Sequence, residues 1–272
     1  MDKTTKIIRD FYNNSVQKEW DRLDRHRIEF ELTKRFLNRY IKEKDKVLDI
    51  GGGPGRYSLY LAERGCDVTL VDLSEANIDY ALHKAEEQGL TLKAFVCDAR
   101  EIERQTSKLY DHILLMGPLY HLLEEKDRIN TVNSCLNLLK PGGIIFISFI
   151  SSYAGIIYSM KYEPQLILNK EIEYQYKYFK DDKPFSGESF TQAFFIRQKD
   201  ILPFMSQFGL EKLHLLGQES CLAPNEPNIL CQPEEVVNKW LNLAEEVCER
   251  EDLLSFSEHL MYIGKKLKSS KK

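Results

Sequence analysis

The feature that most constrains the fold is an alternation of strand-like and helix-like segments between residues 46 and 149. Strands that are joined through helices pair in parallel with right-handed crossovers, and helices then cover both faces of the sheet. The alternation therefore predicts a doubly wound α/β domain. Apolar runs of strand length predict five strands, over residues 46–50, 67–72, 92–98, 110–116 and 143–149. Helical spacing of apolar residues predicts three intervening helices, over residues 56–65, 75–89 and 125–143.

The rest of the chain divides around this core, which we assign to residues 46–150. Residues 1–45 have the spacing of amphipathic helices and are predicted to form a helical flank or lid. In residues 151–196 the alternation stops, and we interpret this tyrosine-rich segment as an insertion that caps the substrate. Residues 197–272 return to regular patterns and are expected to complete a mostly parallel sheet of seven strands. The elements expected there are helices near 198–208 and 233–251 and strands over 210–220 and 259–267.

Composition narrows the class of protein. The formal net charge is -4, which gives no support to binding the phosphate backbone of a nucleic acid. The six cysteines contain no CxxC pair and no spacing suited to zinc, so reduced thiols, a cytoplasmic location and no metal site are expected. The longest nearly uninterrupted apolar stretch, residues 144–150, is far shorter than the about 20 residues of a membrane-spanning helix. Composition favours neither a membrane nor a nucleic-acid partner, and it leaves the oligomeric state open.

Glycines gather at the turn between the first predicted strand and the first predicted helix, in VLDIGGGPGRYSLYLAERGCDVTLVDLS (residues 47–74). Ligands of open α/β sheets bind beyond the carboxyl ends of the strands, usually against this turn. Gly51, Gly53 and Gly55 allow the backbone to take positive φ angles and to approach a ligand closely. Asp72 ends the next strand about 20 residues further on, where a carboxylate can accept the hydroxyls of a ribose. The pattern predicts a cofactor that contains a nucleoside.

The spacing of these glycines is G-x-G-x-G, whereas dinucleotide-binding turns have G-x-G-x-x-G. With Asp49 two residues before the first glycine, the stretch resembles motif I of the class I S-adenosylmethionine-dependent methyltransferases. CDAREI (97–102), YDHILLMGPLYHLLEEKDR (110–128) and LLKPGGIIFIS (138–148) are similar to the next three blocks of that family, in the same order. The resemblance covers residues 46 to about 149. It implies a Rossmann-like fold, S-adenosylmethionine as cofactor and S-adenosylhomocysteine as product.

The resemblance also implies roles for individual residues. Asp49 and the glycines would border the methionine part of the cofactor, and the carbonyl of Met116 would contact its amino group. Asp72 would bind the ribose. Leu73 would lie beside the adenine, and Asp98 with the backbone of its neighbour would meet the adenine amino group. The implied cofactor-binding residues are Asp49, Gly51, Gly53, Gly55, Asp72, Leu73, Asp98, Ala99 and Met116.

Three residues are candidates for catalysis on the acceptor side. His121 and Tyr120 follow the fourth predicted strand, and the unperturbed pKa of a histidine, about 6.5, suits a general base. Tyr12 lies in the N-terminal segment, which resembles the helix that many small-molecule methyltransferases fold over the cofactor. Each residue has a structural alternative: a hydrogen-bonded histidine near a helix start, or tyrosines that only pack.

Several functions fit these observations. A methyltransferase that acts on a small molecule is favoured by the ordered motifs and by the tyrosine-rich insertion. A methyltransferase for RNA or protein is a second hypothesis, although MGPLY (116–120) departs from the (N/D)PP(Y/F) pattern of enzymes that methylate amide or base nitrogens. A non-catalytic module that binds S-adenosylmethionine is a third. A nicotinamide oxidoreductase is disfavoured by the glycine spacing.

Overall fold

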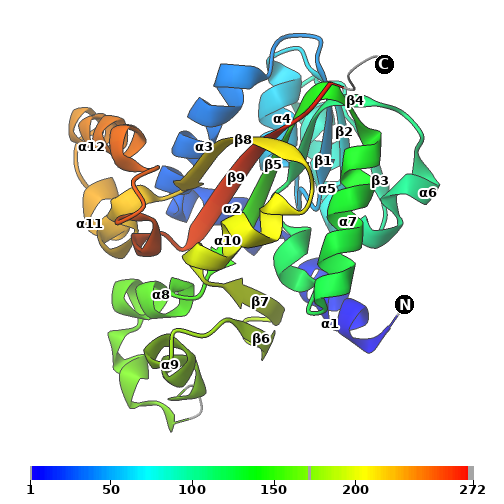
Figure 1. The fold of residues 1–272 in the computed structure, drawn as a ribbon. Coiled ribbons are helices and arrows are strands. Elements are labelled where there is room, and N and C mark those ends of the chain that lie inside the picture. The colour runs from blue at the N-terminus through cyan, green and yellow to red at the C-terminus, as the bar shows by residue number, and fades with distance from the viewer. Residues whose placement is uncertain (1, 171–172, 269–272) are drawn as a thin grey trace.

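The computed structural model describes residues 2–170 and 173–268, and it contains the predicted doubly wound sheet (Figure 1). Strands β3, β2, β1, β4 and β5 pair in that order, and all of these pairs are parallel. β9 continues the sheet beyond β5 in the antiparallel sense, and β8 pairs with β9. The prediction of a mostly parallel sheet is therefore confirmed. The strands are β1 Lys46–Ile50, β2 Asp67–Asp72, β3 Lys93–Val96, β4 Tyr110–Leu115, β5 Leu139–Ser151, β8 Leu210–Gly217 and β9 His259–Lys266.

Helices cover both faces of the sheet, because successive side chains of each strand point to opposite faces. On one face Val47 and Leu114 pack with α3, α4 and α12. On the other face Leu48 and Ile113 pack with α6, α7 and α10. The described part of the N-terminal segment, residues 2–45, contains three helices. The helices outside the insertion are α1 Lys3–Asn13, α2 Val16–Arg25, α3 Arg27–Tyr40, α4 Arg56–Glu63, α5 Glu75–Glu87, α6 Ile102–Gln105, α7 Glu125–Leu138, α10 Gln198–Ser206, α11 Glu226–Leu230 and α12 Glu234–Val247.

The junction between α7 and β5 differs from the prediction. The helix predicted over residues 125–143 ends at Leu138, and β5 begins with the next residue. The pairing of β4 with β5 skips from Tyr110–Leu139 to His112–Ile144, so the KPGG stretch forms a bulge inside the strand. Gly142 has a φ of 82°, which a glycine adopts easily at such a bulge. Turn residues that look like the end of a helix here interrupt a strand instead.

Residues 151–196 add two strands to the predicted seven, so the sheet has nine strands within the part of the chain that the structure describes. Ile150 of β5 pairs with His259 of β9 and also with Phe195 of β7, so β7 lies on the opposite edge of β5 from β9. That edge belongs to β4, and β7 therefore joins the sheet just beyond the carboxyl end of β4. Figure 1 shows α8, α9 and the β6–β7 hairpin together at this end of the sheet. The elements are α8 Ala154–Tyr162, α9 Glu173–Lys180, β6 Phe185–Glu188 and β7 Gln192–Ile196.

The described part of the chain was compared with two features of membrane and secreted proteins, a membrane-spanning helix and disulfide bonds. Within residues 2–170 and 173–268, no helix has both the length and the apolar character needed to cross a membrane. All six cysteines fall within this described part, and none of them forms a disulfide there.

Candidate functional site

A cavity of about 600 Å³ lies at the carboxyl ends of the parallel strands, against α1 and α2. Its volume is in the range of small-molecule binding sites. Gly55 does not belong to its lining. The predicted residues that do line it are Asp49, Gly51, Gly53, Asp72, Leu73, Asp98, Ala99 and Met116 on the cofactor side, and Tyr12, Tyr120 and His121 on the acceptor side. One cavity thus brings together both groups of predicted residues.

The glycines after β1 play different parts. Gly53 has a φ of 58°, and a Cβ atom placed on it would find its nearest described heavy atom at 4.0 Å, so this backbone faces open space in the cavity. Gly51 has a φ of 69°, and a Cβ atom there would lie 2.5 Å from Cδ of Pro118. Gly55 begins α4, and a Cβ atom on it would approach Cβ of Ala81 to 3.0 Å. Gly53 is therefore the open cradle, whereas Gly55 permits close packing of α4 and α5.

Asp72 closes the cradle from the end of β2. Its Oδ2 accepts a hydrogen bond from the backbone N–H of Gly53 at 2.8 Å, and its Oδ1 accepts one from Ser74 at 2.8 Å. Burial raises the pKa of this carboxyl against the lowering effect of these hydrogen bonds. Each carboxylate oxygen has two lone pairs, so Oδ2 can still accept a hydrogen bond from a ligand hydroxyl. The predicted ribose acceptor is thus aimed at the cavity by the backbone of the turn itself.

Asp49 lies beneath the same turn. Its Oδ2 accepts a hydrogen bond from Oγ of Ser58 at 2.7 Å. Burial raises the pKa of Asp49 to about 7, with the nearby Asp72 adding to the effect and Ser58 opposing it. Near neutral pH this carboxyl is therefore divided between its protonated and ionised forms.

The end of β3 brings in Arg100, a residue that our sequence analysis did not single out. The carboxylate expected to meet an adenine, Asp98, accepts hydrogen bonds from the Arg100 backbone N–H at 3.0 Å and from Nη2 at 2.6 Å. Nη2 of Arg100 also donates to Oγ1 of Thr5, in the first turn of α1, at 2.6 Å and to Asp2, the N-cap residue of α1, at 3.1 Å. Arg100 thereby ties α1 over this end of the cavity. The sequence offered only its position, two residues after Asp98.

Tyr12 and His121 are in direct contact, although 109 residues separate them. The Tyr12 hydroxyl lies 2.7 Å from Nε2 of His121, and Nδ1 of His121 lies 3.0 Å from the backbone carbonyl oxygen of Gln192 in β7. A carbonyl oxygen only accepts, so Nδ1 carries the proton and Nε2 accepts from Tyr12. Burial lowers the pKa of His121 to about 4, with the Gln192 carbonyl opposing this shift, and the ring is neutral at pH 7. The contact joins α1, the turn after β4 and the insertion.

The inner end of the cavity, defined here as the part lined by Glu19, Arg22, Glu29 and Gln218, carries charges that our sequence analysis did not place there. Nη1 and Nη2 of Arg22 donate to the two carboxylate oxygens of Glu29 at 2.7 and 2.9 Å. Burial raises the pKa of Glu19. Sequence reasoning missed these residues because charges on an amphipathic helix usually face solvent.

Tyr120 lines the same cavity. Its hydroxyl donates to the backbone carbonyl oxygen of Met116 at 3.2 Å, which is the carbonyl predicted to contact the methionine amino group. Burial raises the pKa of Tyr120 beyond the physiological range, so the hydroxyl stays protonated. Tyr120 thus holds the chain that follows β4 and forms a wall of the cavity.

Among residues 2–170 and 173–268, two groups of side chains have ligand atoms close enough together for a metal ion: His26 with Glu226 and Glu258, and His259 with Glu29 and Glu219. In the first group the ammonium of Lys161 already pairs with both glutamates, and in the second His259 itself pairs with Glu219. Nζ of Lys161 lies 2.9 Å from Glu226 and 2.5 Å from Glu258, and Nδ1 of His259 lies 2.7 Å from Glu219. These contacts satisfy the carboxylates without a metal.

Comparison with known proteins agrees with this geometry. Residues 47–143 match the family model described as a methyltransferase domain. The ubiquinone biosynthesis O-methyltransferase of Coxiella burnetii is 35% identical over 128 residues, which are 46% of this chain and 53% of the relative. The tRNA 5-carboxymethoxyuridine methyltransferase of Escherichia coli is 31% identical over 120 residues, which are 43% of this chain and 45% of the relative. The chain thus spans about half the length of these curated relatives.

The fold extends further than the sequence similarity. The crystal structure of the 1,6-didemethyltoxoflavin N1-methyltransferase of Burkholderia thailandensis, with its substrate and S-adenosylhomocysteine bound, has a TM-score of 0.62. The match covers 96% of this chain and 88% of that protein at 15% identity, so it shows the fold alone. Residues 47–143 thus match the methyltransferase domain family, and the chain has the fold of a methyltransferase structure that holds S-adenosylhomocysteine.

Proposed function

We propose that the chain transfers the methyl group of S-adenosylmethionine to a small-molecule acceptor, leaving S-adenosylhomocysteine. The observation that carries the proposal is the open cradle at Gly53, whose N–H is hydrogen-bonded to the buried Asp72 within the matched domain. When bound, S-adenosylmethionine supplies a methyl group that is already electrophilic because it is attached to a sulfonium. The protein then needs mainly to hold the acceptor atom in line with that methyl group and to exclude water.

Different residues of the cavity are assigned to different parts of the cofactor. Asp72 is assigned to the ribose hydroxyls, and the backbone from Gly51 to Gly53 to the methionine part. Leu73 and Ala99 are assigned to the adenine, with Asp98 held beside it by Arg100.

The amino-acid end of the cofactor needs partners of both charges. The Met116 carbonyl and Asp49 are assigned to its amino group. Arg22 is assigned to its carboxylate, because this guanidinium lines the cavity and its charge acts on Tyr120, the residue that touches the Met116 carbonyl. A guanidinium has five N–H donors, and only two of them engage Glu29, so donors remain for the ligand.

Tyr12 and His121 supply a route for the proton of the acceptor. As the acceptor oxygen or nitrogen forms its bond to the methyl group, its proton can pass to the Tyr12 oxygen. The Tyr12 proton then passes to Nε2 of His121, the atom to which it is already hydrogen-bonded. Because the His121 ring is neutral at pH 7, Nε2 holds a lone pair that can take this proton, and the lowered pKa of about 4 makes the resulting imidazolium release it again readily. Tyr120 is the third candidate, as a wall that orients the acceptor.

The insertion, residues 151–196, is assigned to the acceptor as a cap. Its strand β7 joins β5 beside the end of β4 and supplies the Gln192 carbonyl that fixes the proton of His121 on Nδ1. A small acceptor fits an enclosure built in this way. The absence of disulfides among the six cysteines is typical of a reducing compartment, so we place the reaction in the cytoplasm.

Calorimetric titration with S-adenosylhomocysteine tests the proposal. The wild-type protein is expected to bind it and not to bind NAD. The substitution Asp72→Asn should weaken binding at least about tenfold, because it removes a charge-assisted hydrogen bond. Asp67→Asn, at the exposed first residue of the same strand, is the matched control and should leave the affinity unchanged. No binding by the wild-type protein, or equal affinities of both variants, would refute the assignment.

A tRNA acceptor is the second candidate, because one curated relative is named for a modified tRNA uridine. The formal net charge of -4 gives it no electrostatic support. Incubating a cell lysate with the protein and methyl-labelled S-adenosylmethionine separates the two hypotheses. Label in the small-metabolite fraction supports the proposed function, and label in the RNA fraction replaces it with this alternative.

A further inference from the structure

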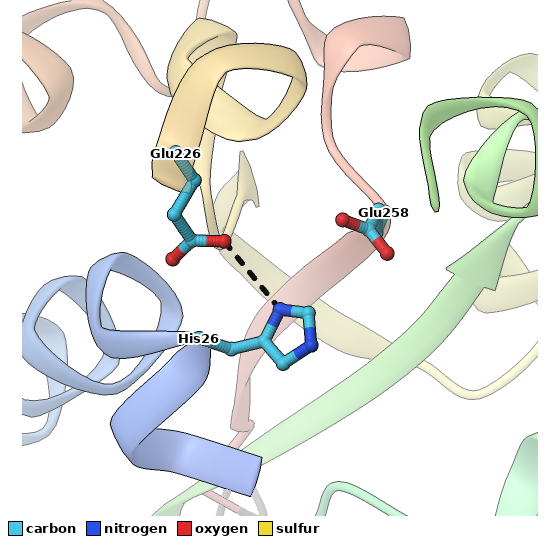
Figure 2. Close-up of side chains that lie close together, drawn as sticks. All are labelled: His26, Glu226 and Glu258. Atoms are coloured by element: carbon cyan, nitrogen blue, oxygen red, sulfur yellow. Dashed lines mark ion pairs between the residues drawn. The ribbon is translucent and has the colours of Figure 1, made fainter. Parts of the chain in front are cut away.

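A network of charged side chains, most of them buried, adjoins the inner end of the cavity. It connects α2 and α3 with the insertion helix α8, with the segment around η5 (Ser220–Asn225) and α11, and with the start of β9. The eight members of this inner charge network are Arg22, His26, Glu29, Lys161, Glu219, Glu226, Glu258 and His259. Figure 2 shows the outer part of it, where Glu226 and Glu258 face the ring of His26 from different elements.

The balance of charge in this network depends on its histidines. Four glutamates face two permanent cations, Arg22 and Lys161. The side chains of Lys161, Glu226 and Glu219 are all 0% exposed, so water cannot compensate an excess of negative charge there. A positive charge on His259 brings the network closer to neutrality.

His259 is held at the junction between the network and the cavity. Its Nδ1 lies 2.7 Å from Oε1 of Glu219, and its backbone N–H donates to Oε2 of the same carboxylate at 3.0 Å. The same Nδ1 atom lies 3.7 Å from Oε2 of Glu29. Burial alone would lower the pKa of His259, but Glu29 and Glu219 outweigh it and raise the pKa to about 9. The ring is therefore an imidazolium at neutral pH.

The Glu29 carboxylate connects His259 to the Arg22 guanidinium in the cavity. It is 5% exposed and lies between the imidazolium of His259 and the guanidinium of Arg22. Burial would raise the pKa of Glu29, but Arg22 and His259 lower it to about 2, so the carboxylate is ionised throughout the physiological range. Because both carboxylate oxygens are bonded to Arg22, any movement of Glu29 moves the guanidinium as well.

We propose that His259 is a positioning residue of the cofactor site: with Glu219 it fixes the carboxylate of Glu29, and Glu29 fixes the Arg22 guanidinium at the inner end of the cavity. The proposal rests on the proposed function, in which Arg22 binds the carboxylate of the cofactor. It predicts that His259, which does not line the cavity within the described residues, controls binding of the amino-acid part of the cofactor alone.

The pH dependence follows from the groups that face His259. They are Glu29 from α3, Glu219 ahead of η5, Arg22 from α2 and the chain neighbour Glu258, with His26 and Lys161 further along the network. The pKa of His259 in the folded state is raised above its ordinary value of 6.5. The positioning effect is therefore complete below pH 6.5 and is lost as the pH rises through about 9.

The test compares two ligands on two variants. His259→Asn keeps a donor near the position of Nδ1 but removes the charge, and Glu219→Gln weakens the hold on His259 from the other side. By calorimetry at pH 7, both variants should bind S-adenosylhomocysteine about tenfold more weakly than the wild-type protein, the loss of one charge-assisted interaction. Both should bind adenosine, which lacks the amino-acid part, with unchanged affinity. The ratio of wild-type to His259→Asn affinity should approach one between pH 8 and pH 10, and this ratio cancels the titration of the ligand's own amino group.

Each outcome decides the proposal. Equal loss of affinity for both ligands indicates a general structural defect and overturns it, as does unchanged affinity for S-adenosylhomocysteine. If His259→Asn fails to fold, Glu219→Gln carries the same comparison. A wild-type protein that binds no S-adenosylhomocysteine refutes the proposed function, and this inference with it. Binding by the wild-type protein with no difference in the variants refutes the inference alone.

Discussion

The cofactor end and the acceptor end of the cavity are built from different groups. At the cofactor end, the turn after β1 supplies backbone N–H groups, and Asp72 is held by Gly53 and Ser74 through their backbones. At the acceptor end, side chains from distant segments meet, as Tyr12 and His121 do. A backbone turn keeps its donors whatever the pH, whereas the acceptor end depends on the protons of two buried side chains. Substitutions in the turn should therefore act through steric clashes, and substitutions at the acceptor end through lost proton transfer.

The largest effect is expected from a side chain in the turn. Gly51→Ala places a Cβ atom 2.5 Å from the rigid ring of Pro118 at a φ of 69°. Strain and overpacking together should cost about 4 kcal/mol of the free energy of unfolding and abolish binding of S-adenosylhomocysteine. Gly89→Ala is the matched control, with a φ of 65° and no described heavy atom within 4 Å, and should cost only about 1 to 2 kcal/mol. Denaturant unfolding measures both variants. Similar values for the two would show that crowding does not define the cofactor end.

A comparable loss of stability is expected from removing a charge of the inner charge network, which adjoins the inner end of the cavity. Lys161→Met leaves Glu226 and Glu258 without the ammonium that lies between them, and breaking such a buried pair costs about 3 to 5 kcal/mol. Lys183→Met, in the same insertion but with a side chain 61% exposed, should change the free energy of unfolding by less than about 0.5 kcal/mol. The difference between them in denaturant unfolding is the measurement. If Lys161→Met were as stable as the control, buried charge would not be what holds the insertion to the core.

The next effect concerns rate rather than stability. Tyr12→Phe removes the hydroxyl that donates to His121 and interrupts the proposed proton route. Methyl transfer into the small-metabolite fraction of a lysate should fall about 100-fold, while affinity for S-adenosylhomocysteine stays within about threefold. Tyr60→Phe, which removes an exposed hydroxyl bonded to Asn38, should affect neither quantity. An unchanged rate for Tyr12→Phe would leave the acceptor end without a proton route through these side chains.

The same contrast explains how far the sequence could be interpreted. The sheet, the glycine turn and the position of Asp72 could be predicted from the sequence. They depend on the spacing of residues within βαβ units, where chain order determines which residues meet. The prediction of a helix up to residue 143 was wrong for its last turn, because only the pairing of β5 with β4 shows that KPGG forms a bulge in a strand. Tyr12 and His121 were each candidates, but their hydrogen bond joins residues 109 positions apart. Arg22 carried no signal, since its helix shows an ordinary amphipathic pattern and its partner Glu29 lies in the next helix.

The smallest effect is expected from a substitution of Arg100, which connects the cofactor end of the cavity to α1. Arg100 binds Asp98 at the cofactor end and also Thr5 of α1 and its N-cap residue Asp2, so it links the segment after β3 to the N-terminal helices. Its side chain is 26% exposed, and solvent screens such contacts, so Arg100→Gln should weaken binding of S-adenosylhomocysteine only about threefold, mainly through faster dissociation. Arg104→Gln, 78% exposed, is the control and should leave the dissociation rate unchanged. A loss as large as that of Asp72→Asn would mean that closure of α1, rather than the cradle, holds the cofactor, and the division between the two ends would no longer stand.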